Sequence, residues 1–237
     1  MGAAMMEDDA TWLAEKARDP RLQRAARILA RLRERGLIDP AVASGFTRGV
    51  LLDAPQTDVD IHYVGDVPTA TAEMWLVEEL RAAEIQDGEW DIWNFQEHDP
   101  LITQIAYGYL VHFASTIDCI HLGADGALHD VTGRGVADAR ARRMHLGHLA
   151  VTDYPYKVGQ LCYMYLEGCR RVFQYGLTAT DESAASLRAN ADLWGRCPEP
   201  DRIYLCERLR EKVPAAQRAA ARPCYAAFGW DSIFDEV

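Results

Sequence analysis

The chain has 237 residues, of which 49% are hydrophobic, and its 25 basic against 36 acidic residues give a formal charge of −11 at pH 7. This length and apolar content favour a globular fold with a substantial core and exclude a disordered chain. The acidic balance disfavours a surface that grips a long nucleic acid, because contacts to phosphates dominate such binding.

Neither a membrane span nor a secretion signal is predicted. No apolar run approaches the roughly 20 residues that cross a bilayer. The first residues, Met-Gly-Ala-Ala-Met-Met-Glu-Asp-Asp, lack a basic segment followed by an apolar core. We therefore expect a cytoplasmic protein with no membrane partner.

Hydrophobic periodicity and turn residues predict alternating helices and strands over the first 95 residues. The helix expected at 69–83 begins with Thr69 as its N-cap. The predicted elements are helices at 8–18 and 20–35, a strand at 40–43, a two-turn helix after a turn at 44–45, a strand from 58 to 63, a helix at 69–83 and a strand at 90–95.

The rest of the chain is predicted to be mainly helical. Asp87-Gly88 is a hairpin-type turn before the strand at 90–95, and the largely apolar residues 100–114 could be helix or strand, with a helix favoured at 101–109. Further helices are expected at 155–175, 180–195, 199–212 and 215–227. The sequence thus predicts an α+β fold: a domain over 1–150 with a small mixed sheet flanked by helices, then an all-α domain over 151–237.

The strand at 58–63 carries the first chemical signal. Val59, Ile61 and Tyr63 alternate with Asp58 and Asp60, so the two aspartates project from one face, about 7 Å apart at the backbone. Two adjacent carboxylates repel each other unless a cation lies between them. Oxygen ligands without His or Cys favour Mg²⁺, with Mn²⁺ as a substitute, and Mg²⁺ typically takes one or two carboxylates plus substrate phosphates.

Upstream, a turn of small residues precedes a short helix at Ser44-Gly45. Backbone N–H groups at such a turn can meet a phosphate. A phosphate-holding turn followed by a magnesium pair is the outline of a nucleotidyl-transfer site.

These two features together resemble a known motif. The pattern Gly-Gly/Ser-x-x-Arg-Asp/Gly-x-Leu-Leu-Gly followed by Asp-x-Asp-Ile is found in class II CCA-adding enzymes and bacterial poly(A) polymerases, which are DNA polymerase β-like nucleotidyltransferases. The residues at these positions here are Ser44, Gly45, Arg48, Gly49, Leu51, Leu52, Asp53, Asp58, Asp60 and Ile61, with Asp53 in place of the glycine that follows the two leucines. The resemblance implies a nucleotidyltransferase head domain, with Asp58 and Asp60 as metal ligands and Ser44, Gly45 and Arg48 against the phosphates.

The resemblance also assigns a third acid. Residues 89–96 are similar to the neighbouring strand of the family, which places Asp91 on the family's third acid and Gln96 on its arginine. Asp91 is then expected to complete the metal site or to accept the proton of the attacking hydroxyl. The alternative is an aspartate bonded within the sheet edge. His62 is interpreted as a strand residue rather than a base.

A second stretch, residues 115–120, resembles the family's Phe-Thr-Ile-Asn-Ala-Ile, with Asp118 at the Asn, and the resemblance implies that a hairpin follows at 124–130. The family's preceding Arg-Arg-Asp is replaced by residues 111–114, which lack arginine. In the family these positions contact the sugar and phosphates of the nucleotide, so the loss of positive charge should weaken or redirect triphosphate binding.

In the region similar to the helical neck of the family, Asp153 and Lys157 fall on two positions of the Glu-Asp-x-x-Arg motif that reads the base, and Tyr154 falls on its second acid. A phenol and an amine do not reproduce that planar read-out. Alternation between CTP and ATP is therefore not expected.

The resemblance covers roughly residues 20–190 and implies transfer of a nucleoside monophosphate from an NTP, with Mg²⁺ and release of pyrophosphate. Because the charge is −11 and no counterpart of the family's body and tail follows, we expect a small molecule or a protein side chain as the acceptor rather than tRNA. Two alternatives remain: an RNA 3′-end nucleotidyltransferase acting with a partner, and a catalytically inactive nucleotide-binding module.

Overall fold

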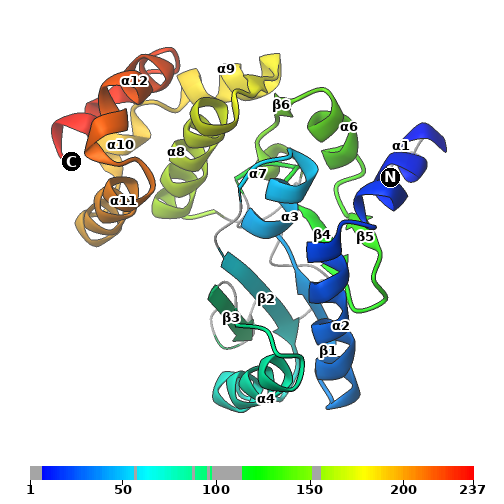
Figure 1. Cartoon of the computed structure of the whole chain (residues 1–237). Helices are drawn as coiled ribbons and strands as arrows, with labels where there is room; N and C mark the ends of the chain where they lie inside the picture. The colour runs from blue at the N-terminus through cyan, green and yellow to red at the C-terminus, as the bar shows by residue number, and fades with distance from the viewer. Residues whose placement is uncertain (1–6, 56–57, 87–88, 95–96, 98–113, 151–155) are drawn as a thin grey trace. The chain divides into compact units, whose positions relative to one another are not determined.

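The computed structural model describes residues 7–55, 58–86, 89–94, 97, 114–150 and 156–237 (Figure 1). The chain divides into two compact units. The first unit comprises Met1–Leu110 and Ile117–Ala139, and the second comprises Val111–Thr116 and Arg140–Val237. The domain limits predicted from the sequence, 1–150 and 151–237, stay a prediction. The helix predicted at 101–109 lies outside the described residues.

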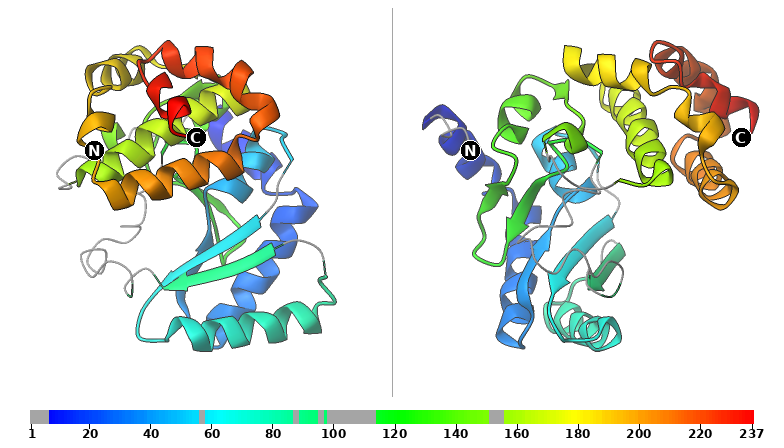
Figure 2. Two further views of the ribbon diagram at one scale, coloured as in Figure 1. Left: turned by 90° about the vertical axis from the view of Figure 1, so that its left-hand side faces the viewer. Right: turned by 180° about the vertical axis from the view of Figure 1, so that it is seen from behind.

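A five-stranded mixed sheet organises the first unit, in the strand order β3-β2-β1-β4-β5. Strands β2 and β3 are parallel, whereas β1 pairs with both of its neighbours in antiparallel fashion and β4–β5 form the predicted hairpin. Figure 2 shows β2 and β3 side by side and pointing the same way. The strands are β1 (Ile38–Val42), β2 (Asp58–Val64), β3 (Glu89–Asn94), β4 (Ile120–Gly123) and β5 (Leu128–Asp130).

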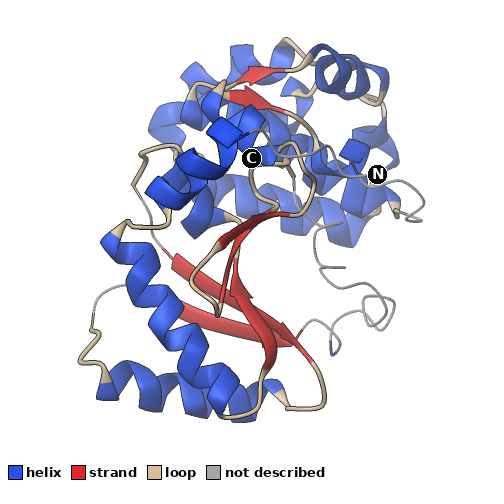
Figure 3. Ribbon diagram, turned by 90° about the vertical axis from the view of Figure 1, so that its right-hand side faces the viewer, coloured by secondary structure: helices blue, strands red, loops and turns tan. Residues whose placement is uncertain are grey.

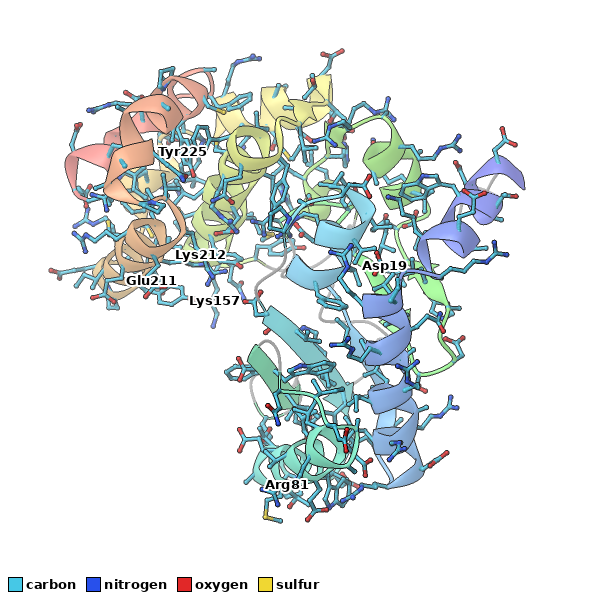
Figure 4. The ribbon with its side chains drawn as sticks, viewed as in Figure 1. Asp19, Arg81, Lys157, Glu211, Lys212 and Tyr225 are labelled. Atoms are coloured by element: carbon cyan, nitrogen blue, oxygen red, sulfur yellow. The ribbon has the colours of Figure 1, made fainter. Side chains whose placement is uncertain are left out.

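Helices pack on the apolar face of this sheet (Figure 3). The amphipathic helix α2 (Pro20–Glu34) buries an apolar stripe from Leu22 to Leu32 and contacts β1, β4 and α4 (Thr69–Ala82). Its start is fixed by Asp19, labelled in Figure 4, whose carboxylate accepts a 2.9 Å hydrogen bond from the Arg21 N–H. The other helices of this part are α1 (Glu7–Lys16), α3 (Gly45–Leu51) and α6 (Gly135–Arg140).

The predicted cap of α4 is wrong. The N-cap residue is Pro68, and Thr69 already lies inside the helix. The Thr69 hydroxyl donates instead to the Glu97 carboxylate over 2.6 Å and accepts from the Asn94 N–H over 3.2 Å. The Thr69 side chain thus links the start of α4 to residues at and after the end of β3. A threonine in this role cannot be distinguished from an N-cap threonine by sequence alone.

The second unit is mainly helical, as predicted. Its longest helix ends at Gly176, which adopts the left-handed conformation (φ 59°) that favours glycine. Two short parallel strands, β6 (Arg143–Met144) and β7 (Thr178–Ala179), are its only described sheet. The remaining elements are α7 (Gly147–Ala150), α8 (Val158–Tyr175), α9 (Asp181–Ala189), α10 (Leu193–Arg196), α11 (Glu199–Lys212), α12 (Ala215–Ala226) and the 3-10 helix η3 (Asp231–Asp235).

An ion-pair cluster joins α8 to α11 inside the second unit. The Nε of Arg170 lies 3.1 Å from both carboxylate oxygens of Glu167, Arg171 Nη1 lies 2.8 Å from Oε2, and Arg208 Nε lies 3.3 Å from Oε1. Glu167, Arg170 and Arg171 are buried, and Arg208 is part-buried. The three guanidinium groups hold the pKa of the Glu167 carboxyl well below its usual range against the opposing effect of burial.

None of the helices in the described part of the chain is both long enough and apolar enough to cross a bilayer. All six cysteines are free thiols, and five of them are buried.

Candidate functional site

The carboxylates singled out in the sequence lie on one face of the sheet. The parallel register of β2 and β3 pairs Asp60 with Asp91. Because paired residues of neighbouring strands point to the same side of a sheet, Asp58, Asp60 and Asp91 share one face. Val59 and Ile61 are buried on the opposite face. Asp58 and Asp60 are part-buried and Asp91 is exposed, so this acidic row is partly open to solvent.

The predicted phosphate turn lies directly beside this row. A Cβ atom on Gly45 would be 3.5 Å from Asp58 Oδ1 and 3.9 Å from Arg48 Nη2. Both distances are ordinary van der Waals contacts, so both side chains reach the residue that begins α3. The turn, Asp58 and Arg48 therefore meet at one point.

Ser44 at the start of the turn has a strained backbone. Its φ of 60° and ψ of −118° lie in a region that glycine adopts easily and serine rarely. The Ser44 N–H donates to the Asp118 carbonyl over 3.2 Å, and the Ser44 carbonyl accepts from the Arg48 N–H over 3.0 Å. These two hydrogen bonds hold the residue in a conformation that costs energy locally, a feature concentrated at functional sites.

Arg48 and Asp118 form a buried ion pair between Nη1 and Oδ1. The two residues are 70 positions apart in the sequence, and their side chains are only 4% and 1% exposed. Asp118 thus contacts the turn twice, through its carbonyl at Ser44 and through its carboxylate at Arg48. The structure brings the two motifs of the sequence together at this point.

Neutral imidazoles continue the same face of the sheet. His62 is two residues beyond Asp60, and burial, with a smaller contribution from His121, lowers its pKa to about 3. His121 on β4 is also buried, with its pKa lowered to about 4, and its ring stacks on His129 at a centroid distance of 5.2 Å. His62 and His121 therefore carry no charge at neutral pH and add no cation to this face.

Sequence reasoning missed His121 and His129. Both alternate with apolar residues, Leu122 and Leu128, and the hairpin register pairs them directly. The alternation of polar and apolar residues that identified Asp58 and Asp60 would also have identified these two histidines, once the two strands of the hairpin were placed in register.

The predicted site residues separate into two groups. Ser44, Gly45, Arg48, Asp58, Asp60, Asp91 and Asp118 all lie in the first unit, around one end of the sheet. Lys157, labelled in Figure 4, lies in the second unit at the start of α8, where it is exposed and its N–H donates to Gln160 Oε1 over 2.9 Å. Asp153, like Gln96, lies outside the described residues.

The chemistry of the acidic row fits a hard divalent cation. Within the described ranges no three His, Cys, Asp or Glu side chains are arranged to hold a metal ion. Mg²⁺ does not require such a cage, because it commonly takes one or two carboxylates and completes its octahedron with water and substrate phosphates. Asp58, beside the turn at Gly45, and Asp60 on the same strand face could provide such a partial set of ligands.

No protein-family model and no curated protein matches the chain. Several solved structures do match the chain. A tRNA-processing enzyme in an apo form superposes with a TM-score of 0.66 at 15% identity, over 92% of this chain and 59% of that one. The CCA-adding enzyme of Bacillus stearothermophilus in complex with CTP gives a TM-score of 0.61 at 16% identity, over 91% and 54% of the two chains.

The CCA-adding enzyme of Thermotoga maritima complexed with tRNA gives a TM-score of 0.61 at 17% identity, over 96% of this chain and 55% of that one. The chain therefore spans between half and three fifths of the length of these three neighbours. At such identities the likeness establishes the fold. It confirms, at that level, the α+β architecture and the resemblance identified in the two sequence motifs.

Proposed function

We propose that this chain is a Mg²⁺-dependent nucleotidyltransferase that moves a nucleoside monophosphate from an NTP to a hydroxyl group of a small molecule or a protein side chain. The observation that carries the proposal is the convergence of Asp58 and Arg48 on Gly45, with Asp60 and Asp91 in register on the same face. The fold shared with CCA-adding enzymes supports the same type of reaction.

In this reaction the acceptor oxygen forms a bond to the α-phosphorus and the bond from the α-phosphorus to the bridging oxygen breaks, which releases pyrophosphate. Asp58 and Asp60 would hold Mg²⁺, which supplies positive charge for the phosphates when it is bound. Asp91, exposed beside Asp60, would take the proton of the acceptor hydroxyl or complete the metal site.

The turn at Ser44-Gly45 would orient the leaving phosphates. The N–H groups of the first turn of a helix have no acceptor within the helix, so those of α3 can meet phosphate oxygens. The Ser44 N–H itself is engaged by the Asp118 carbonyl. Arg48 would add one charged donor beside Gly45, provided that its guanidinium is available.

A small acceptor agrees best with the charge of −11. One observation favours an RNA 3′ end instead. Arg24, Arg27 and Arg31 line a groove of about 560 Å³ between α2 and the end of α4, and one structural neighbour was solved with tRNA. Arg31 is already paired with Glu79 over 3.2 Å, which reduces the positive charge of this groove.

Pyrophosphate release tests the proposal. Each of the four NTPs would be incubated with Mg²⁺ and the protein, with a metabolite pool as acceptor in one series and a total tRNA fraction in the other. We expect release with the metabolite pool that falls by at least a hundredfold in Asp58→Asn and Asp60→Asn. The matched control is Asp125→Asn, an exposed acid of the same unit that lies outside the site.

Release only with the tRNA fraction would replace the small acceptor by an RNA 3′ end. Release that is unchanged in both aspartate variants would refute the proposed site. Absence of release from all four NTPs, together with absence of NTP binding, would leave a catalytically inactive module with this fold.

A further inference from the structure

The buried pair of Arg48 and Asp118 bears on how tightly the site binds its donor nucleotide. The inference drawn from this pair rests on the proposed function. Arg48 lies beside Gly45 together with Asp58: a Cβ on Gly45 would be 3.9 Å from Arg48 Nη2 and 3.5 Å from Asp58 Oδ1. Its Nη1 contacts Asp118, whose side chain is 1% exposed. The charge of the arginine is therefore balanced inside the protein before any phosphate arrives.

A guanidinium that binds a carboxylate has fewer N–H donors left for a phosphate. Carboxylate and phosphate oxygens compete for the same charge-assisted hydrogen bonds. Solvent screens a buried pair weakly, so Asp118 also cancels most of the attraction that Arg48 exerts on a nearby anion. Asp58, Asp60 and Asp91 add three more negative charges to the described part of the site.

An asparagine at position 118 would keep the shape of the side chain and could accept a hydrogen bond from Arg48 without cancelling its charge. The difference between Asp and Asn is thus almost purely electrostatic here. We propose that Asp118 lowers the affinity of the site for its donor: it neutralises Arg48, weakens binding of the donor's phosphates, and makes that binding depend on the accompanying Mg²⁺.

The direct test is a set of four proteins: wild type, Asp118→Asn, Arg48→Gln and the double variant. Each would be titrated by calorimetry with each of the four NTPs, at low and at saturating Mg²⁺, after thermal denaturation has shown that it folds. We expect Asp118→Asn to bind NTP at least fivefold more tightly than wild type, with the larger gain at low Mg²⁺.

The double variant keeps the test decisive even if Asp118→Asn does not fold. It replaces an ion pair by two neutral amides of similar shape, an exchange that buried pairs tolerate better than loss of one partner. If Arg48 is already neutralised in the wild type, the double variant should bind NTP within threefold of it. A tenfold or larger loss would show that the charge of Arg48 reaches the phosphates in spite of Asp118, and would overturn the inference.

Asp138→Asn is the matched control. Asp138 is another buried acid of the first unit, and its Oδ2 lies 3.1 Å from Arg134 Nε. Its substitution removes the same charge from an equally buried carboxylate, although its partner Arg134 is 39% exposed, and should change NTP affinity less than twofold. A gain equal to that of Asp118→Asn would reduce the effect to the overall charge of the protein and would refute the inference.

The proposed function and this inference can fail separately. NTP binding by wild type that is unchanged or weaker in a folded Asp118→Asn removes the inference alone. Binding by Asp118→Asn but not by wild type supports both. Absence of NTP binding in both proteins removes both.

Discussion

Each unit contains a buried arginine–carboxylate pair within a larger group of charges, and the two groups are imbalanced in opposite directions. In the first unit one arginine, Arg48, pairs with Asp118, and Asp58 of the partly open acidic row lies beside Gly45 with it. In the second unit one carboxylate, Glu167, holds three arginines. We use this difference to ask which group belongs to the proposed site and which stabilises the fold.

The cluster around Glu167 is drawn from two regular helices. Its members on α8 are three or four residues apart, which is the spacing of neighbours on a helix, and Arg208 joins them from α11. Its carboxylate is surrounded by donors, and no residue of the cluster has a strained backbone. We interpret it as a structural junction between the helices.

The cluster around Arg48 is assembled from a turn, a strand and a loop that are far apart in the sequence. It contains the strained Ser44 and an open row of carboxylates. Such strain and excess charge persist only where the surrounding fold imposes them, and they are typical of sites that bind something. We infer from this difference that the acid excess, and not the arginine excess, marks the proposed site.

The largest effect is expected from Glu167→Gln. This change leaves three arginines around a neutral amide in a buried place, and breaking a buried pair in this way costs about 3–5 kcal/mol. Urea denaturation at pH 7 measures the free energy of unfolding. A loss below about 1 kcal/mol would contradict the structural role of this cluster.

His62 in the first unit and Glu167 in the second unit should affect stability in different pH ranges. The pKa of His62 is lowered to about 3 in the folded protein, so the unfolded chain binds a proton more readily below pH about 6.5. Stability from the neutral imidazole is present above that pH and is lost as the pH falls towards 3, by up to about 1.4 kcal/mol per pH unit. His62→Gln should flatten the stability profile between pH 7 and 5.

The Glu167 carboxyl affects the free energy of unfolding at lower pH than His62 does. Its folded pKa is lowered, so its stabilising contribution is present above the unfolded value of about 4 and is lost as the pH falls below it. In Glu167→Gln the slope between pH 7 and 5 should match that of wild type. A flattened slope in that variant would contradict the assignment of the two windows.

The strain at Ser44 predicts a stabilising substitution. Glycine adopts φ 60° and ψ −118° without the steric cost that serine meets, although it also increases the entropy of the unfolded chain. We expect Ser44→Gly to raise the free energy of unfolding by about 1 kcal/mol. A decrease in stability would show that the hydroxyl group contributes more than the backbone strain costs.

A smaller effect is expected at Asp53, where the family pattern has glycine. Asp53 has φ 54°, a left-handed conformation that aspartate tolerates, and its exposed carboxylate lies 2.7 Å from Lys16 Nζ. Asp53→Gly removes the strain and the surface ion pair together, so thermal denaturation should show a net change below about 1 kcal/mol. A larger loss would mean that this pair is more than a surface contact.

The fold and the acidic row could be predicted because local patterns encode them. The alternation around Asp58 and Asp60 places both aspartates on one face, and the apolar spacing of α2 and α8 determines the buried sides of these helices. Gly45 could be assigned to a turn for the same reason. These features depend on neighbours within a few residues.

The pairing of Arg48 with Asp118 could not be predicted in this way. The two residues are 70 positions apart, and only the strand order β2-β1-β4 brings the loop before β4 to the turn before α3. The sequence showed that an acid replaces the family's asparagine. It did not show that the same acid contacts the arginine. The junction at Glu167 was missed because its fourth member, Arg208, lies on another helix.

The central claim is that the acidic row of the first unit binds a donor nucleotide with a metal. Calorimetric titration of each Mg²⁺–NTP complex into wild type and into Asp58→Asn/Asp60→Asn tests it most directly. We expect wild type to bind at least one Mg²⁺–NTP complex, and its affinity to fall at least tenfold in the folded double variant. Equal affinity in the two proteins would contradict it.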